Sequence, residues 1–327
     1  MRMKLCASLA LALLCVCAPS ILHAQESVSQ YPQRAVKIIV PFPAGGTADI
    51  LPRIVGEKLR KKFGQPFIIE NRSGAGGNVG ADAVSRSDAD GYTLLASPPG
   101  PLVINESLYT NLGYRPSDFE PIIILGVVPN VLAVKSAFPA KTVGELIAFV
   151  KANPEKITFA SQGNGSTSHL TAVMFQSMTA LRMVHVPYRG TAPALQDLIG
   201  GNVDLFFDNL GSSLNLHQSG KIRILAVGSP NRVNALPGIP SIQEAGVAGF
   251  QSITWFALMA PAGTPKIVVD RLNSTILEIL QDATVASQFA KIGVQIMRAN
   301  VTETRTFIES ERSRWRDVIK SAGVTMQ

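Results

Sequence analysis

A glycine-rich segment at residues 42–49 combines residue types that can bind a small anion. It contains Gly45 and Gly46, followed by Thr47 and Asp49. An apolar run at 36–40 precedes the segment and apolar residues recur at helical spacing after it, so we predict a strand, a loop and a helix. The first N–H groups of a helix have no partner within it and lie at the positive end of its dipole, which suits a carboxylate. An ordinary tight turn explains the segment equally well.

A second polar glycine loop, at 163–169, repeats this arrangement later in the chain. It follows a predicted strand at 157–160, and helical spacing begins again at Leu170. The loop ends in Gly165, Ser166, Thr167, Ser168 and His169. Serine and threonine are favoured helix N-caps and supply hydroxyl donors. Two such loops facing each other would form a clamp around an anion.

The serines and histidine of the second loop also raise the possibility of a hydrolase. A nucleophile elbow of the form G-x-S-x-G is absent from the sequence. Adjacent residues such as Ser168 and His169 point in different directions at the start of a helix. A secreted serine hydrolase therefore remains the weaker alternative, and we expect no catalytic residues.

Cofactor and metal sites are also not expected. Gly74, Gly76 and Gly80 follow a predicted strand and loosely resemble a dinucleotide fingerprint, but the next strand ends in Ser97 and not in an acidic residue. The histidines His169, His185 and His217 are isolated, without a second ligand at metal-binding spacing.

The chain begins with a basic start, a short apolar stretch and a small residue at Ala24. This pattern predicts a signal peptide at residues 1–24, cleaved after Ala24. All three cysteines lie within it, so the mature protein has no thiol or disulfide. Cleavage leaves 28 basic and 23 acidic residues, a formal charge of +5. Because the basic residues are scattered, nucleic acid is not an expected partner.

Short apolar runs alternate with amphipathic stretches along the mature chain, and the pattern restarts midway, which predicts two α/β domains. The predicted strands are 35–40, 66–70, 92–97, 119–126, 130–134, 157–160, 184–188, 203–208, 221–227 and 256–260. Besides the helix after the first loop, the predicted helices are 81–87, 142–153, 170–178, 191–199, 265–281, 283–292 and 302–321. Pro52 lies early in the first helix, which is comfortable only if the helix begins near Asp49.

Seven motifs, taken in order, resemble the Bug (TctC-type) family of extracytoplasmic solute receptors of tripartite tricarboxylate transporters. They are PFPAGGTAD at 41–49, NRSGAGGNVG at 71–80, DGYTLL at 90–95, GSTSHL at 165–170, VPYRG at 186–190, PSIQEAG at 240–246 and APAGTP at 260–265. The likeness extends along essentially the whole mature chain. Pro52 departs from the pattern, because a small residue is more usual there.

The resemblance implies an α/β periplasmic binding protein fold (type II-like), with two lobes, a central ligand cleft and two crossover strands near 127–130 and 254–256. One lobe would comprise 26–127 plus 255–327 and the other 128–254. It also implies a periplasmic, monomeric receptor that grips a carboxylate between the two loops, partly through ordered water, and delivers it to membrane transporter subunits. A sensory receptor that presents the same ligand to a signalling partner is the alternative.

The expected ligand is a di- or tricarboxylate, an amino acid or an aromatic acid. The predicted contacts in the first loop are Phe42, Ala44, Gly45, Gly46, Thr47 and Asp49, and in the second loop Gly165, Ser166, Thr167, Ser168 and His169. Further into the cleft we expect Asn78, Ser97, Tyr188, Thr191 and Asp208, with Trp255 as another candidate. A carboxylate at Asp208 would favour a ligand with an ammonium or hydroxyl group.

Overall fold

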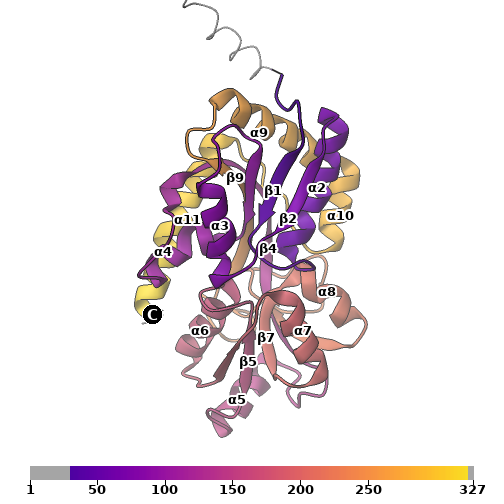
Figure 1. Ribbon diagram of the computed structural model, residues 1–327. Helices are drawn as coiled ribbons and strands as arrows, with labels where there is room; N and C mark the ends of the chain where they lie inside the picture. Colours follow the sequence, from indigo (N-terminus) through magenta and orange to yellow (C-terminus); the bar gives the residue numbers. More distant parts are fainter. Residues whose placement is uncertain (1–29, 323–327) are drawn as a thin grey trace, which may run out of the picture.

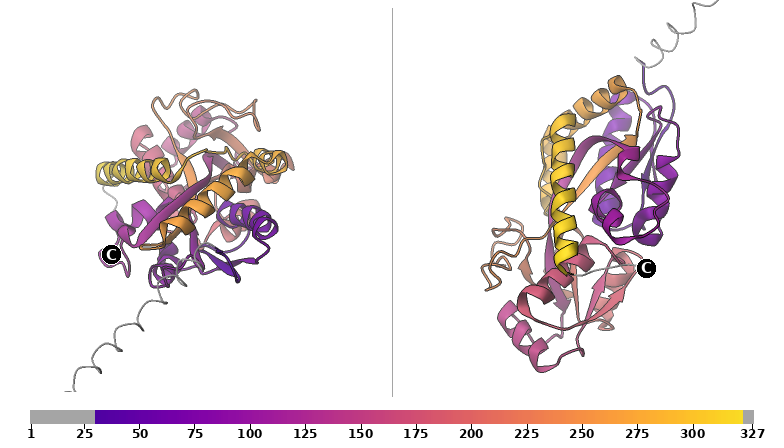
Figure 2. Two further views of the ribbon diagram at one scale, coloured as in Figure 1. Left: turned by 90° about the horizontal axis from the view of Figure 1, so that it is seen from above. Right: turned by 90° about the vertical axis from the view of Figure 1, so that its left-hand side faces the viewer.

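The computed structural model describes residues 30–322 and shows two α/β lobes, one above the other in Figure 1. The predicted signal peptide, residues 1–24, lies outside the described residues. Each lobe is built around its own set of strands, and helices cover both faces of each sheet (Figure 2).

The sheet of the first lobe contains β1 (Val36–Val40), β2 (Phe67–Asn71), β3 (Thr93–Ser97), β9 (Ile253–Pro261) and the first part of β4 (Phe119–Lys135). Their order across the sheet is β2-β1-β3-β9-β4. The strand β1 is parallel to both of its neighbours, whereas β9 is antiparallel to β3 and to β4.

The sheet of the second lobe contains β5 (Thr158–Ser161), β6 (Val184–Pro187), β7 (Leu205–Asn209), β8 (Ile222–Val227) and the second part of β4. Here β5 is parallel to its two neighbours, β6 and β7, and β4 is antiparallel to β7 and β8. The strands β1 and β5 therefore occupy equivalent positions in the two lobes, as the restart in the sequence pattern predicts.

A single long strand, β4, joins the two sheets. The prediction of separate strands at 119–126 and 130–134 is wrong, because the chain stays extended through Pro129. Up to Pro129 the strand pairs with β9, and from Asn130 onward it pairs with β7. Proline has no N–H for a strand ladder and so resembles a break in the sequence. In the structure Pro129 lies opposite Ile253, where β4 passes from one sheet to the other.

The helix after the first glycine loop, α2 (Thr47–Phe63), begins two residues earlier than predicted, with Gly46 as its N-cap. Asp49 lies in the first turn, as expected. Pro52 is consequently inside the helix, where its missing N–H leaves the carbonyl of Ala48 without its usual helical donor. The carbonyl of Gly46 accepts from the N–H groups of Asp49 and Ile50, so the first turn is closed at Gly46 in spite of that loss.

Two short 3₁₀ turns, η1 (Ala75–Gly77) and η3 (Pro116–Asp118), were not predicted. Two longer helical segments are also absent from the predictions. One is α8 (Leu210–Gln218), whose sequence LGSSLNLHQ is short and has little helical periodicity. The other is a π-turn at Gly100–Ile104 that continues into α4 (Asn105–Leu108). The remaining predicted helices are present as α3 (Asn78–Ser85), α5 (Val143–Ala152), α6 (Thr167–Thr179), α7 (Thr191–Gly200), α9 (Lys266–Gln281), α10 (Ala283–Lys291) and α11 (Val301–Ala322).

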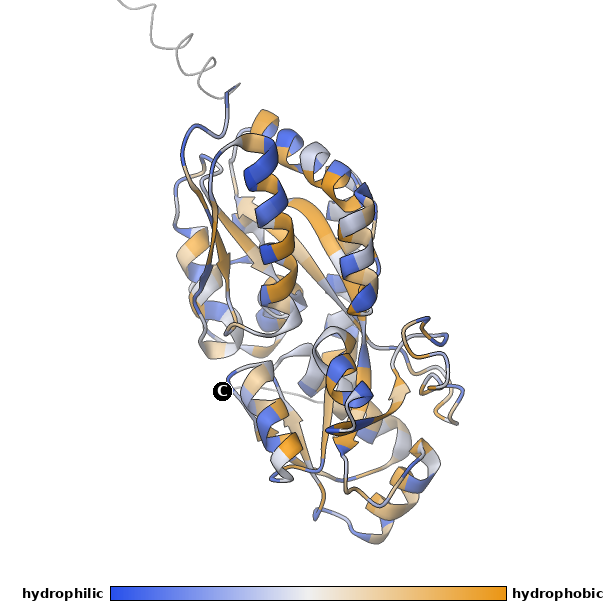
Figure 3. Cartoon of the chain, turned by 90° about the vertical axis from the view of Figure 1, so that its right-hand side faces the viewer, coloured by the Kyte–Doolittle hydropathy of each residue, from blue (hydrophilic) through white to orange (hydrophobic). Residues whose placement is uncertain are grey.

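Alternating strand residues bury both faces of the first sheet. Ile38 belongs to a cluster with Leu51 of α2 and Ile276 of α9, whereas Ile39, on the opposite face, belongs to a cluster with Trp315 of α11. Figure 3 shows the result, with hydrophobic strands inside helices whose hydrophilic residues lie on the outer surface. None of the described helices is long and apolar enough to cross a bilayer.

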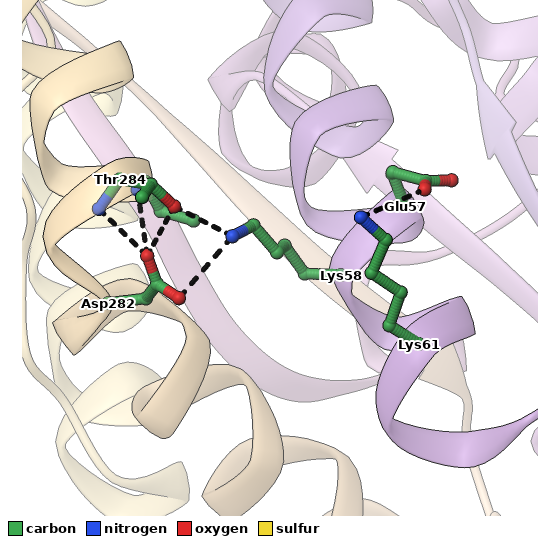
Figure 4. A network of polar contacts seen from close by, with 6 residues as sticks. Glu57, Lys58, Lys61, Asp282 and Thr284 are labelled. Carbon is green, nitrogen blue, oxygen red and sulfur yellow. Dashed lines mark hydrogen bonds and ion pairs between the residues drawn. The ribbon is translucent and has the colours of Figure 1, made fainter.

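A polar contact fixes the helices on one face of this sheet. Lys58 of α2 reaches α10, where its ammonium lies 3.3 Å from Asp282 Oδ2 and donates to Thr284 Oγ1 at 2.7 Å (Figure 4). Asp282 is also the N-cap of α10. The contact holds α2 in place, and with it the glycine loop at its N-terminus.

Candidate ligand-binding site

Both predicted loops lie at the carboxyl ends of equivalent strands, the edge where ligands collect in α/β sheets. The first loop follows β1 and leads into α2, and the second follows β5 and leads into α6. The sequence therefore predicts the position of both loops correctly.

In the first loop, Asp49 turns back toward the start of the loop. Its buried carboxylate accepts from the N–H of Gly45 at 3.1 Å and from Asn71 Nδ2 at 2.9 Å, and it forms an ion pair with Arg53 at 2.8 Å. Burial opposes its charge, but the bonds from Arg53, Asn71 and Gly45 prevail, so the pKa of Asp49 is lowered. Asp49 thus shapes the loop from behind and remains ionised at neutral pH.

The start of α2 leaves backbone donors available. Gly46 has extended geometry and no side-chain cap. In the described part of the chain, the N–H groups of Gly46, Thr47 and Ala48 have no hydrogen-bond acceptor, as expected for an uncapped first turn. Ala44 and Gly45 are exposed beside them. This is the arrangement that a carboxylate can occupy.

The second loop, in contrast, is bonded to itself. Ser166 is the N-cap of α6 and accepts from the N–H of His169 at 3.3 Å, while Ser168 Oγ accepts from the N–H of Gln162 at 2.9 Å. His169 Nδ1 accepts from the N–H of Gly165 at 3.2 Å. These bonds give the loop a defined shape before any ligand is present.

Two imidazole rings support the second loop from beneath. His169 stacks on His185 with ring centroids 4.1 Å apart, and Phe159 also stacks on His185 at 4.8 Å. Burial lowers the pKa of His169 to about 4 and that of His185 to about 3. Both rings are therefore neutral. No cluster of metal-ligating side chains occurs among the residues that the structure describes.

The two lobes touch across the interface between the loops. Thr47 Oγ1 lies 3.1 Å from Ser212 Oγ at the start of α8. A Cβ atom placed on Gly46 would lie 3.0 Å from Thr191 Oγ1, and one on Gly190 would lie 2.8 Å from Pro43. Glycine at these positions permits this close approach of the two lobes.

A cavity of about 390 Å³ lies between the lobes beside the first loop. It is within the usual size of small-molecule sites, about 300–1,000 Å³. Its lining comes from four segments, two from each lobe. They are 41–43 and 73–77 on one side and 162–163 and 188–190 on the other. Of the predicted contact residues, Phe42 and Tyr188 line this cavity. The hydroxyl of Tyr188 donates to Asp197 at 2.6 Å.

Behind the cavity, Asp208 is wholly buried. Its carboxyl group accepts from Gln162 Nε2 at 3.0 Å and from Ser213 Oγ at 2.7 Å, and burial raises its pKa to about 7. Gln162 Nε2 also donates to Thr191 Oγ1 at 3.0 Å. Gln162 therefore separates Asp208 from the cavity and connects it to the edge of the site.

Three further candidates bond within the first lobe. Asn78 Oδ1 accepts from the hydroxyl of Tyr114 at 2.9 Å, and Ser97 Oγ donates to the carbonyl of Pro98 at 2.9 Å. Trp255 Nε1 donates to Glu311 at 2.9 Å. The roles of these residues, and of the other predicted contacts, in ligand binding stay predictions.

The sequence prediction misses Gln162, Arg189 and the wall at 73–77. Gln162 precedes the second loop by one residue, and a polar side chain directly after a strand is a signal that could have included it. Arg189 and the 73–77 wall lie within motifs that support the family resemblance. Neither segment has residues at a spacing typical of a catalytic or metal site.

A family model described as "Tripartite tricarboxylate transporter family receptor" matches residues 51–324. The chain belongs to this family. Protein BugT of Bordetella pertussis is 39% identical over 307 residues, which cover 93% of this chain and 94% of BugT. Because the family consists of solute-binding receptors, the chain is a receptor and not an enzyme, and the hydrolase alternative falls away.

Two solved structures of this receptor type share the fold. That of R. palustris Rpa4515 with adipate has a TM-score of 0.89 at 38% identity, and covers 90% of this chain and 99% of that chain. That of MatC from Rhodopseudomonas palustris with bound malate has a TM-score of 0.84 at 31% identity, and covers 88% and 100%. The predicted periplasmic binding protein fold with two α/β lobes is therefore confirmed.

Proposed function

We propose that this receptor binds a small carboxylate in the periplasm and delivers it to a membrane transporter of the tripartite tricarboxylate type. One observation carries the proposal: the first loop, at the N-terminus of α2, meets the second lobe at Gly190, Thr191 and Ser212 beside the interlobe cavity, and it has backbone donors without acceptors. The adipate and malate bound to two similar receptors support a carboxylate ligand.

Hydrogen bonds from the first loop can provide the micromolar affinity that a carrier needs. A micromolar dissociation constant corresponds to about −8 kcal/mol. Hydrogen bonds to a charged group contribute roughly 1.5–3 kcal/mol each, so three or four donors suffice after the ordering costs. The N–H groups of residues 46–48 and the hydroxyl of Thr47 provide that number without a buried cation.

Closure would occur about the crossover strands, with 26–127 plus 255–327 as one proposed lobe and 128–254 as the other. A buried polar cluster at this point supports that division. Asn130 Oδ1 accepts from Asn209 Nδ2 at 2.8 Å and from Thr254 Oγ1 at 3.1 Å. Thr254 Oγ1 also lies 3.0 Å from Thr167 Oγ1 at the end of the second loop, so the crossovers contact the site directly.

Calorimetry against mono-, di- and tricarboxylates, amino acids and aromatic acids tests the proposal. We expect micromolar binding of at least one acid. Its amide or ester should not bind, because neither carries the negative charge of a carboxylate. Absence of binding by every acid, together with tight binding of a sugar or an amine, would contradict it.

The cellular role is tested separately. The predicted signal peptide and the family's transporter association support a monomeric periplasmic receptor that feeds transporter subunits. Deleting the gene should abolish uptake of the ligand. Normal uptake with loss of a transcriptional response to the ligand would favour the sensory alternative.

A further inference from the structure

The interlobe cavity has an unbalanced charge. Among the residues that line it in the described part of the chain, Arg189 is the only one with a charged side chain, and none carries a carboxylate. The other lining residues are glycines, prolines, small residues, Gln162 and two aromatic residues. An anionic group that enters the cavity would therefore meet one cation and no repulsive charge.

Arg189 is also unpaired, in contrast to most arginines of this protein. Twelve other arginines form ion pairs with Asp or Glu. Within residues 30–322 the guanidinium of Arg189 has neither an ion-pair nor a hydrogen-bond partner. Its five N–H donors, arranged for bidentate contact with a carboxylate, are available to a ligand.

The backbone around Arg189 is held firmly. The N–H of Tyr188 donates to the carbonyl of Ser161 at 3.0 Å and that of Gly190 to the carbonyl of Gln162 at 3.2 Å, so both neighbours are fixed to the end of β5, directly before the second loop. On the first-lobe side, Gly74, Ala75, Gly76 and Gly77 all have positive φ and no large side chain. This wall leaves room opposite the guanidinium. Arg189 itself is exposed, which locates its side chain at the solvent side of the cavity.

We propose that Arg189 determines ligand specificity by receiving a second acidic group of the ligand at the mouth of the interlobe cavity. The inference rests on the proposed function, because the first carboxylate is assigned to the glycine loops. The ligand class is a short chain with an acidic group at each end. A monocarboxylate would use the loops alone and leave Arg189 solvated.

The test compares diacids with monoacids of the same carbon chain, namely succinate with butyrate, glutarate with pentanoate and adipate with hexanoate. Calorimetry on the mature wild-type protein should show that at least one diacid binds about tenfold or more tightly than its monoacid partner. Arg189→Gln should reduce this preference to about twofold or less without weakening the monoacid. Arg189→Lys should keep part of it, because the charge remains but the bidentate fork is lost.

Arg182→Gln is the matched control, because Arg182 is an exposed arginine of the same lobe that pairs with Glu155 at 3.5 Å and does not line the cavity. It should retain the full preference.

The inference is overturned if Arg189→Gln keeps the preference, or if it weakens diacid and monoacid equally, which would indicate a role in the shape of the loop. Monoacid binding without any diacid preference in the wild type contradicts this inference alone. Failure of every acid to bind contradicts the proposed function and this inference together.

Discussion

The two glycine loops occupy equivalent positions in the two lobes, yet their hydrogen bonding differs. The second loop satisfies its own backbone through Ser166, Ser168 and His169. The first is held by Asp49 and by Asn71, which donates to the carbonyl of Phe42, and leaves the N–H groups of residues 46–48 without acceptors. Equivalent topology has therefore produced one preformed wall and one loop with unused donors.

This difference has a functional meaning for a receptor that must bind and release. Donors that are already aligned but unpaired gain their acceptor only when the ligand arrives, so most of the binding energy should come from the first loop. The second loop is rigid and provides shape for closure. We therefore expect changes at the donors and close contacts of the first loop to alter affinity. Changes at the residues that hold the shape of a loop, His169 in the second and Asp49 in the first, should alter stability.

The largest effect on binding is expected from Gly46→Val. A Cβ atom at Gly46 would already lie 3.0 Å from Thr191 Oγ1 and 3.3 Å from Thr191 Cβ, and valine adds two methyl groups at this contact between lobes. Overpacking typically costs about 1–3 kcal/mol, and we expect the upper end, about a hundredfold loss of acid affinity. Calorimetry measures the affinity, and small-angle scattering shows whether ligand still closes the lobes.

Gly238→Val is the control for this substitution, because a Cβ atom there has no neighbour within 4 Å and the backbone φ is not positive. It should bind as the wild type does. Unaltered affinity in Gly46→Val would show that the lobes do not approach at this glycine when ligand is bound.

The second-largest effect is expected from His169→Asn, and it concerns stability. Burial lowers the pKa of His169 to about 4, below the value of about 6.5 in the unfolded chain. The neutral ring thus contributes stability above pH 6.5 that is lost as pH falls toward 4, because the unfolded state takes up the proton first. We expect this contribution to be on the order of 2 kcal/mol.

Asparagine keeps an acceptor for the N–H of Gly165 but does not titrate. Urea unfolding between pH 7 and pH 4 should therefore show a shallower loss of stability in His169→Asn than in the wild type. The remaining slope belongs to His185 and His217, whose pKa values are also lowered by burial, and to Asp208, whose raised pKa acts in the opposite direction. An identical slope in both proteins would mean that His169 is accessible to solvent protons in the folded state.

An intermediate effect, in a different pH range, is expected from Asp49→Asn. Because hydrogen bonds and Arg53 lower the pKa of Asp49, its contribution is present above its unfolded value of about 3.9 and is lost as pH falls below it. At pH 7 the variant should be about 1–2 kcal/mol less stable, and near pH 3 the difference should shrink. Asp317→Asn, at an exposed carboxylate, should change stability little at either pH. A loss of equal size at both pH values would contradict the ionic role of Asp49.

The positions of the two loops could be predicted from the sequence, but the contrast between them could not. Apolar periodicity locates the strands before Gly45 and Gly163, and the serine and threonine residues of the second loop indicate helix caps. The start of α2 at Thr47 was not predictable, because Pro52 favours a later start and Gly46 has no side-chain cap. The continuity of strand β4 could not be predicted either, because Pro129 is accommodated in a strand through its pairing with β9.

The cavity was less predictable than the loops. Gln162 is relevant because it donates to the buried Asp208. Arg189 is relevant because the other residues that line the cavity carry no charge. Such surroundings arise from contacts between distant segments and have no local signal. The positive φ of Ala75 is a further example, because an alanine in the sequence does not predict a left-handed backbone conformation.

The smallest effect, and the sharpest test of the comparison, is expected from Thr47→Val. Thr47 is buried, and its hydroxyl lies 3.1 Å from Ser212 across the interlobe contact. Valine keeps the shape and removes one hydrogen bond, which is worth about 1 kcal/mol, so acid affinity should fall by about fivefold with little change in the unfolding midpoint of the free protein. Thr304→Val is the matched control, since the buried Thr304 hydroxyl has no partner among the described residues and its removal should not weaken binding. If the two variants bind the acid equally well, the hydroxyl of Thr47 neither closes the lobes nor contacts the ligand, and the first loop acts through its backbone alone.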